Sequence, residues 1–273
     1  MKKIKLSVPL LVSFVLLSGC QGQPAPETMV RLATTTSVRD TGLLDVLTET
    51  FQATGYTLQS IAVGSGQAMQ LGKTGEADIL WVHSPDDELE FVAQGYGTER
   101  TTFLHNDFVL LGPPADPARV KGTKKAADAF KKIAAAKAGF VSRADKSGTH
   151  KKELKLWQAA GVMPGPECYV EAGQGMAGTL SVANEKNAYA LADRSTFLSM
   201  KKNIGLVIVS EGDAALINRY SLILVSSAKF PRVNAAGARA FFGFMLSKPA
   251  KDIIETFGQD VYGRQLFFYD YRK

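Results

Sequence analysis

The sequence has few of the residues that cross-link a small fold or bind metals. Its 273 residues include two cysteines and three histidines. Two cysteines are too few for a disulfide framework or a four-cysteine zinc site. The histidines (His83, His105 and His150) are far apart in the sequence and show no metal-ligand spacing. We therefore expect no metal held directly by side chains and no cofactor.

A large excess of one charge is also absent. The chain has 32 Lys plus Arg and 26 Asp plus Glu, a formal net charge of +6. Residues 1–19 contain three lysines and no acidic residue, so without them the charge falls to +3. That charge is too small to indicate nucleic-acid binding. With 45% hydrophobic residues the composition is globular, and the length allows one large domain or two of about 100–150 residues.

Long apolar runs are missing except near the N-terminus. Leu6–Leu17 is almost wholly apolar and follows three lysines, but it is too short to span a bilayer as a mature helix. It leads into Leu17–Cys20 (LSGC), which resembles a bacterial lipobox, in which the cysteine becomes the lipidated first residue. We expect a signal peptide at 1–19, then lipidated Cys20 and a polar, proline-rich tether at 20–28. A plain signal peptide cut elsewhere is the alternative. The lipid alone would hold the protein at the periplasmic or cell-surface face of a bacterial membrane.

Short apolar segments alternate with helix-like segments along the rest of the chain. This alternation is typical of an α/β fold with mainly parallel sheets and ligands at the carboxyl ends of the strands. The expected strands are Val30–Thr34, Leu58–Val63, Asp78–Val82, Asp107–Leu111, Phe140–Ser142, Cys168–Glu171, Leu206–Val209 and Tyr220–Ser226. The expected helices include one that buries Leu43, Leu44, Leu47 and Phe51, then Gln67–Lys73, Thr149–Ala160 with Leu154 and Trp157 on one side, one from about Met176, Ala235–Ser247 and Pro249–Phe257.

Two of the expected strands stand where the chain would cross between two lobes. These are Asp107–Leu111 and Tyr220–Ser226. They predict a lobe 1 built from residues 29–110 plus 222–273, and a lobe 2 built from residues 111–221.

Three expected strands end in small hydroxyl residues or glycines immediately before a helix. They lead into Thr34–Ser37, Gly64–Gln67 and Ser142–Thr149. Helix starts expose unpaired N–H groups and a partial positive charge, hydroxyls add donors, and glycine allows close approach to the backbone. Such ends bind anions. Ser and Thr also cap helices in proteins of every kind, but three such loops in one chain favour an oxyanion site.

Arg143 is the fixed cation of the third loop. Its planar pairs of donors suit an oxyanion, and Asp145 is placed to hold it. The alternative is a surface ion pair of little energetic value.

These loops also resemble those of known proteins. Arg143 and Ser147–Thr149 resemble the R-x-D-x-S-G-T loop of periplasmic phosphate-binding proteins. Thr34–Ser37 followed by Thr41–Leu44 resembles the TTTS…SGLL opening of the tungstate-binding proteins of ABC transporters (TupA-type). The resemblance to this second family extends from about residue 30 to the C-terminus. Further segments that share it are Gly64–Ala68, Gly75–Asp78, Val82–Pro85 and Asp193–Thr196.

The resemblance implies a class II periplasmic-binding-protein fold, in which two α/β lobes joined by two crossover strands close on a tetrahedral oxyanion. The expected ligand is tungstate, which a monomer binds without chemical change and delivers to an ABC transporter permease. The ligand-binding residues carried over by position are Thr35, Thr36, Ser37, Ser65, Gly66, Arg143, Ser147, Gly148 and Thr149, with Gln174, Gly175 and Met176 as weaker candidates.

The stretch Val82–Pro85 bears on the choice of anion. In the phosphate binders the corresponding loop holds an aspartate that accepts the proton of hydrogen phosphate, whereas here His83 and Ser84 occupy it, with Asp86 close by. A site of donors alone favours a dianion without a proton, such as tungstate, molybdate or sulfate. Tungstate and molybdate share charge and shape, so only the resemblance favours tungstate. Molybdate, sulfate and phosphate remain alternatives.

Two other functions fit parts of the sequence. Gly173–Gly178 matches GxGxxG, and Asp193 follows at the distance of a ribose-binding acid, so a dinucleotide site is an alternative that the lipobox disfavours. Ser147 and His150 are close enough to pair in an extracytoplasmic serine hydrolase. Turnover of an ester would distinguish the hydrolase from a binding protein.

Overall fold

The structure is a computed structural model that describes residues 28–272. The predicted signal peptide and the lipidation site Cys20 lie outside the described residues, as does nearly all of the tether. Within residues 28–272, no helix has the length and apolar character needed to cross a membrane.

The main sheet is mixed. Its path runs from β10 (Phe268–Tyr269) through β4 (Gly97–Gly112), β9 (Ile217–Val225), β3 (Ile79–Val82) and β1 (Met29–Thr35) to β2 (Thr57–Val63), and β7 (Ala190–Asp193) and β8 (Val207–Ser210) also pair with β4. β1 runs parallel to β2 and β3, but β9 is antiparallel to β3 and to β4. The expectation of mainly parallel sheets is therefore wrong. The reason is that β4 carries the chain away from the parallel strands and β9 brings it back.

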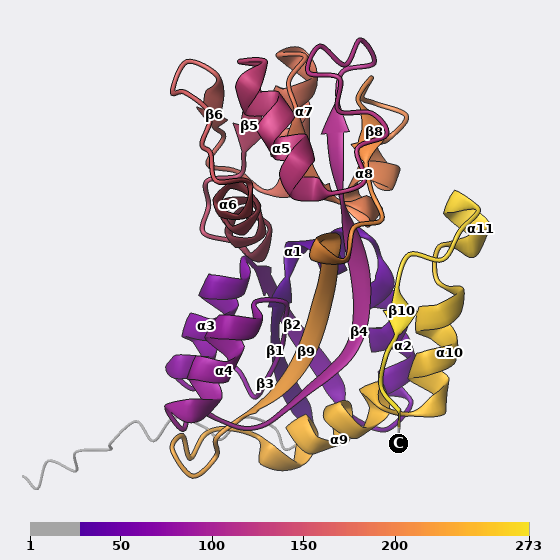
Figure 1. Ribbon diagram of the computed structural model, residues 1–273. Helices are drawn as coiled ribbons and strands as arrows, with labels where there is room; N and C mark the ends of the chain where they lie inside the picture. Colours follow the sequence, from indigo (N-terminus) through magenta and orange to yellow (C-terminus); the bar gives the residue numbers. More distant parts are fainter. Residues whose placement is uncertain (1–27, 273) are drawn as a thin grey trace, which may run out of the picture.

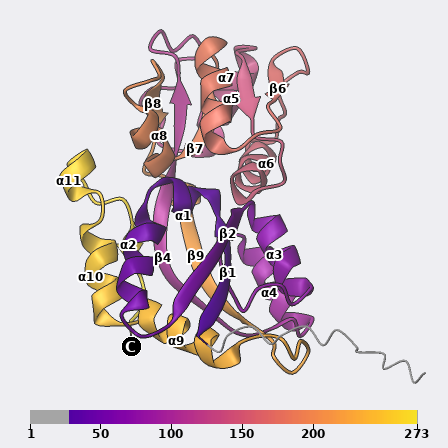
Figure 2. The same ribbon diagram turned by 180° about the vertical axis from the view of Figure 1, so that it is seen from behind.

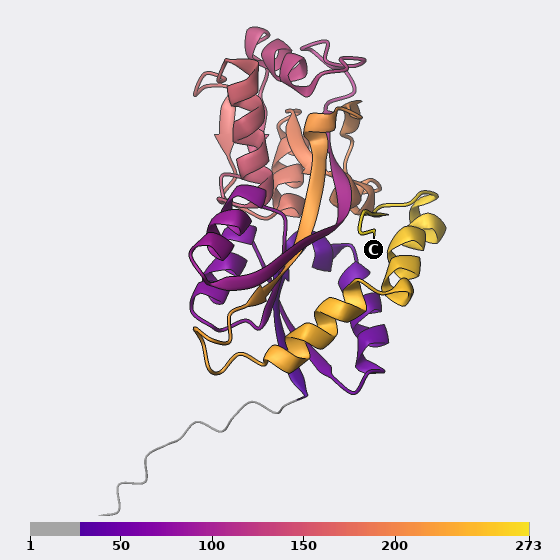
Figure 3. The same ribbon diagram turned by 60° about the horizontal axis from the view of Figure 1, so that its bottom comes forward.

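β4 and β9 connect the two halves of the molecule. The first part of β4 pairs with β9, and its end pairs with β7 (Ala190–Asp193) and β8 (Val207–Ser210). Figure 1 and Figure 3 show the two strands running side by side from the lower half into the upper half. We call these halves lobe 1 and lobe 2; the predicted boundaries at 110/111 and 221/222 remain a prediction. The sequence showed only the apolar end of β4, because residues 97–106 mix polar with apolar side chains.

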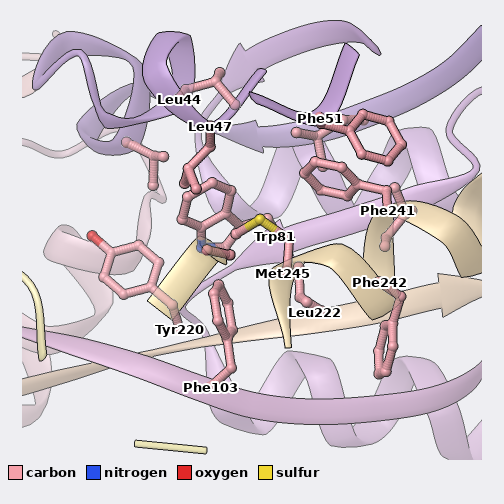
Figure 4. Packing of buried hydrophobic residues seen from close by; sticks show 14 of the residues in the cluster. Leu44, Leu47, Phe51, Trp81, Phe103, Tyr220, Leu222, Phe241, Phe242 and Met245 are labelled. Carbon is pink, nitrogen blue, oxygen red and sulfur yellow. The ribbon is translucent and has the colours of Figure 1, made fainter. Parts of the chain in front are cut away.

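Helices cover both faces of the sheet in lobe 1. α2 (Leu43–Gln52), α9 (Ala235–Met245) and α10 (Lys248–Thr256) lie on one side, and α3 (Ser65–Lys73) and α4 (Pro85–Ala93) on the other (Figures 1 and 2). The predicted buried face of α2 is confirmed, and it packs with aromatic residues of the sheet and α9 (Figure 4). Burial of this cluster is the main apolar stabilisation of lobe 1.

Lobe 2 packs its helices around short strands. The helices are α5 (Ala126–Ala135), α6 (Gly148–Ala160), α7 (Met176–Glu185) and α8 (Arg194–Met200), and β5 (Phe140–Ser142) pairs in parallel with β6 (Tyr169–Glu171). Trp157 of α6 is buried as predicted, with its ring 4.4 Å from that of Phe130.

The predicted position of Leu154 on the buried face of α6 is wrong. Leu154 is 42% exposed, and the buried face consists of Glu153, Leu156, Trp157 and Ala160. Glu153 is tolerated there because it accepts hydrogen bonds from Trp157 Nε1 (3.2 Å) and Tyr169 Oη (2.6 Å). The helix itself is confirmed, but an acidic residue at a core position hid which of its faces is buried.

Four short elements complete the fold. β10 pairs with β4, so the aromatic C-terminal segment packs on its own lobe. The elements are α1 (Thr36–Asp40), the 3₁₀ helix η1 (Ala214–Leu216), α11 (Gln259–Tyr262) and β10 (Phe268–Tyr269).

Candidate functional site

The first two predicted loops leave the sheet side by side. Thr35 ends β1 and is followed at once by α1, while Gly64 joins β2 to α3. β1 and β2 are parallel, and Thr35 lies opposite Val63 in their register. The hydroxyls of Thr35, Ser37 and Ser65 therefore stand at one edge of lobe 1.

The third loop comes from lobe 2 and meets the second. A Cβ atom built on Gly64 would lie 3.7 Å from Ser147 Cβ, and one on Gly66 would lie 3.7 Å from the Lys146 carbonyl oxygen. Both contacts are at ordinary van der Waals distance, so these backbones face each other directly. The structure thus brings the Ser65–Gly66 and Ser147–Thr149 loops together across the two lobes.

Gly148 packs against His83 of lobe 1. A Cβ on Gly148 would approach His83 Cε1 to 2.6 Å and the His83 carbonyl oxygen to 3.1 Å. Any larger residue would push the start of α6 away from lobe 1, so glycine is required here for steric reasons. His83 in turn lies against Tyr220 of β9, with ring centroids 4.7 Å apart.

Most of the predicted site side chains are buried at this junction. Thr36 is half-buried and Gly66 is exposed. The six side chains that are at most 5% exposed are Thr35, Ser37, Ser65, Arg143, Ser147 and Thr149.

The Arg143 loop is organised by one carboxylate. Asp145 Oδ2 accepts from the Arg143 guanidinium, with Nε at 3.1 Å, as predicted from their spacing. Asp145 Oδ1 accepts from the Ser147 backbone N–H at 3.1 Å. Ser147 Oγ caps α6 by accepting from the His150 N–H at 3.3 Å. A guanidinium and the start of a 13-residue helix are thus held in one loop, a combination that attracts anions.

Ser65 has a buried hydroxyl group without a partner. Its Oγ is one of four buried side-chain N or O atoms of residues 28–272 that make no hydrogen bond. Leaving a buried polar group unpaired costs about 1–3 kcal/mol. An anion at the junction would satisfy this hydroxyl.

His83 stays neutral at the junction. Burial, followed by the positive charges of Arg143 and Lys152, outweighs its bond to Asn218 and lowers the pKa of His83 to about 4. Its Nδ1 lies 2.9 Å from Asn218 Oδ1. The Val82–Pro85 segment drew attention to His83, but its contacts with Gly148, Asn218 and Tyr220 could not be read from the sequence.

The nearby carboxylates turn away from the buried residues. Asp86 is 74% exposed and pairs with Lys155 of α6. Asp87 accepts from Ser84 Oγ at 2.6 Å and pairs with Lys151 of α6. Both acids are therefore engaged with lysines of α6 across the two lobes, and neither accepts a hydrogen bond from Thr35, Ser37, Ser65, Ser147 or Thr149.

A cavity of about 300 Å³ opens beside this junction. Lys151, Lys152 and Lys155 line it together with His83 and Gly148, whereas Ser65 and Arg143 do not. The candidate anion-binding hydroxyls thus lie outside this cavity.

Comparisons with known proteins show the family to which the chain belongs. The family model described as a PBP superfamily domain matches residues 22–249. A tungstate-binding protein TupA from Peptoclostridium acidaminophilum is 46% identical over 263 residues, which cover 92% of each chain. The chain belongs to this family of tungstate-binding proteins, within the PBP superfamily.

Two solved structures of similar proteins support the same assignment. The crystal structure of the tungstate ABC transporter from Geobacter sulfurreducens is 42% identical, with a TM-score of 0.77 over 84% of this chain and 99% of that one. The tungstate-binding protein TupA from Desulfovibrio alaskensis G20 is 44% identical, with a TM-score of 0.76 over 89% and 99%. The predicted α/β periplasmic-binding-protein fold is confirmed. These relatives are solute-binding proteins of ABC transporters.

The family motif Asp193–Thr196 contains a second buried arginine whose environment the sequence did not show. Arg194 pairs with Asp107 and, at 2.6 Å, with Glu211, while its Nη1 is buried without a partner. Asp193 caps α8 by accepting from Thr196 N–H at 2.9 Å. The motif pointed to Arg194 itself, but Asp107 and Glu211, which pair with it, come from distant segments of the sequence.

The weaker candidates are not buried polar groups like those of the three loops. Gln174 and Gly175 are exposed, and Met176 packs in a hydrophobic cluster of lobe 2. The GxGxxG alternative has no free ribose acceptor, because Asp193 is engaged by its own helix through Ser195 and Thr196.

The hydrolase alternative lacks its dyad. Ser147 Oγ bonds the backbone of His150, and His150 Nδ1 accepts from the Lys146 N–H at 3.1 Å. Neither atom is arranged to pass a proton from serine to imidazole.

Proposed function

We propose that this chain captures one tetrahedral oxyanion per monomer, tungstate in the first place, and delivers it to an ABC transporter permease. Loops from both lobes would surround the anion: Thr35–Ser37 and Ser65–Gly66 from lobe 1, and Arg143 with Ser147–Thr149 from lobe 2. Residues 29–110 plus 222–273 would move as lobe 1 against residues 111–221.

The single observation that supports this proposal most is the buried Ser65 hydroxyl group. It has no partner among residues 28–272, and it stands where the helix start beside Arg143 meets lobe 1. A desolvated donor next to a guanidinium and a helix start needs a negatively charged acceptor.

Thermal unfolding tests the proposal. Tungstate that binds the folded chain alone should stabilise it by about 4 kcal/mol at a thousandfold excess over Kd, and so raise the melting temperature. Molybdate, sulfate and phosphate serve as competing ligands in the same assay. The proposal of an oxyanion-binding protein fails if none of the four anions moves the melting curve.

Attachment through a lipid on Cys20 is part of the proposal. A basic start, a short apolar segment and the LSGC sequence support it. Cys20→Ser should release the protein from the membrane fraction or leave an uncleaved precursor. Wild-type protein that is fully soluble, with an N-terminus elsewhere, would remove the lipid anchor and leave anion binding untouched.

A further inference from the structure

A chain of buried polar side chains runs behind the first loop, from His83 to Ser37. His83 Nδ1 lies 2.9 Å from Asn218 Oδ1, and Asn218 Nδ2 donates to Asn106 Oδ1 at 2.8 Å. Asn106 Nδ2 donates to Tyr220 Oη at 3.4 Å, and Tyr220 Oη lies 3.1 Å from Ser37 Oγ. None of the five side chains is more than 7% exposed. Burial at this level is costly for polar groups unless all of them are paired.

The amide pair of this chain sits on the connecting strands. Asn106 of β4 and Asn218 of β9 are direct cross-strand neighbours. Figure 4 shows the Tyr220 hydroxyl turned away from the hydrophobic cluster that holds its ring. The network therefore joins the strands between the lobes to the loop that carries Ser37.

The hydrogen bonds run in one direction. Asn218 accepts from His83 Nδ1–H and donates to Asn106, and Asn106 donates to Tyr220. Tyr220 Oη accepts from Asn106, and we assign its single proton to Ser37 Oγ, which lies 3.1 Å away. Burial, and then the negative charge of Asp193, raise the pKa of Tyr220 well above its usual range, so the proton stays in place.

Ser37 Oγ thereby accepts from Tyr220, and it has only its own proton to offer when Thr35 Oγ1 donates to it as well. Its Oγ lies 3.1 Å from Thr35 Oγ1 and 3.1 Å from Tyr220 Oη. When both neighbours donate, the two lone pairs of Ser37 are occupied, and its own proton points to the anion. Tungstate, molybdate and sulfate accept such a bond through any oxygen. Hydrogen phosphate also carries a proton that needs an acceptor.

We propose that Tyr220 is a positioning residue that selects anions without a proton, because it fills the Ser37 lone pair that hydrogen phosphate would need. This inference rests on the proposed function, since Ser37 must face the anion. It assigns the discrimination to a side chain that need not touch the ligand.

The test is Tyr220→Phe, titrated by calorimetry with tungstate, sulfate and phosphate at pH 7. The affinities for tungstate and sulfate should fall by the same small factor, because the Ser37 hydroxyl that binds both anions loses its fixed orientation. Phosphate should gain an acceptor, so the ratio of phosphate to tungstate affinity rises about tenfold. The ratio of sulfate to tungstate affinity should stay within threefold.

Tyr189→Phe is the matched control. Tyr189 is also buried, and its hydroxyl accepts from Ala118 N–H at 3.0 Å and donates to Asp116 Oδ1 at 2.7 Å within lobe 2. This variant loses the same atom and should leave both ratios unchanged. Adding Ser37→Ala to Tyr220→Phe should abolish the gain for phosphate. If Tyr220→Phe does not fold, Thr35→Val frees the other lone pair of Ser37 and should shift the ratio in the same direction.

Several results would overturn the inference. One is a change of all three affinities by the same factor in Tyr220→Phe. Another is an equal shift of the ratio of phosphate to tungstate affinity in Tyr189→Phe. A wild-type protein that binds phosphate as tightly as sulfate would contradict the donor directions assigned to the hydrogen bonds from His83 to Ser37. Wild-type protein that binds no anion at all would overturn the proposed function as well, whereas binding with unmoved ratios removes only the role of Tyr220.

Discussion

Two buried arginines of lobe 2 stand at similar places and have opposite surroundings. Arg143 lies between β5 and α6, and Arg194 lies at the junction of β7 and α8. Arg143 has one carboxylate partner, Asp145, which is shared with a backbone N–H. Arg194 is held between Asp107 and Glu211. The Arg143 region thus has no excess of negative charge. At Arg194 the two negative charges of Asp107 and Glu211 exceed the single positive charge of the guanidinium.

This difference shows that the neighbours of an arginine decide whether it can hold an anion. At Arg143 the helix start of α6 and the free Ser65 hydroxyl add to the attraction. At Arg194 a dianion would meet two carboxylates at short range, which opposes binding. We therefore propose that Arg143 binds the ligand and that Arg194 has a structural role.

The largest expected effect is that of Arg143→Ala on tungstate binding. Removing one partner of a buried, hydrogen-bonded charge pair costs about 3–5 kcal/mol, so the Kd should rise about 10²–10⁴-fold. Calorimetric titration of the folded variant measures it. Arg143→Lys should recover only part of the loss, because a point charge does not reproduce the planar fork. Binding by Arg143→Ala within threefold of wild type would place the arginine outside the site.

The second expected effect concerns His83, which lies against the start of α6. Its pKa is lowered from 6.5 to about 4 in the folded chain. The unfolded chain therefore takes up the proton first, and the stability that His83 contributes above pH 6.5 is lost as the pH falls towards 4, by about 3 kcal/mol. The free energy of unfolding of His83→Gln should depend less on pH over this range. Parallel curves for the two proteins would contradict the burial of a neutral imidazole.

The third effect sharpens the contrast between the arginines. Arg194→Ala removes the cation between Asp107 and Glu211, so the free energy of unfolding should fall by about 1–3 kcal/mol. Tungstate binding by the folded variant should stay within threefold of wild type. Urea unfolding and titration on the same sample measure both quantities. A loss of binding as large as that of Arg143→Ala would remove the distinction.

The smallest effect is expected for Thr36→Ala in the first loop. Thr36 is half-buried and offers one neutral hydrogen bond, worth about 1 kcal/mol, so the Kd should rise up to about tenfold. Thr41→Ala is a control further along the same segment, since Thr41 Oγ1 donates to the Val38 carbonyl oxygen at 2.9 Å. Equal losses in both variants would indicate a general effect on α1.

The sequence predicted those parts of the fold where local pattern and tertiary burial agree. The face of α2 repeats at helical spacing, and Phe140–Ser142 is an apolar strand of the length observed. Prediction failed where a buried polar residue or a half-exposed strand broke the pattern, as at Glu153 in α6 and in the first part of β4. Strand direction was also missed, because pairing between β4 and β9 depends on contacts far apart in the sequence.

The candidate site was predictable in its loops but not in its support. Motifs placed Ser65, Arg143 and Ser147 near one another, and Asp145 followed from its spacing to Arg143. Asn106, Asn218 and Tyr220 belong to no motif, and only the packing of two strands against a loop joins them to His83 in one hydrogen-bonded network. The spacing of residues in a sequence does not predict side chains that only position other side chains.

Anomalous diffraction at a tungsten absorption edge, from crystals grown with tungstate, tests the central claim most directly, because it locates the anion without reference to any variant. The account predicts one tungsten peak per chain, within hydrogen-bonding reach of Ser65, Arg143 and the start of α6. A peak beside Arg194, or full occupancy elsewhere with Ser65 still unpaired, would contradict it.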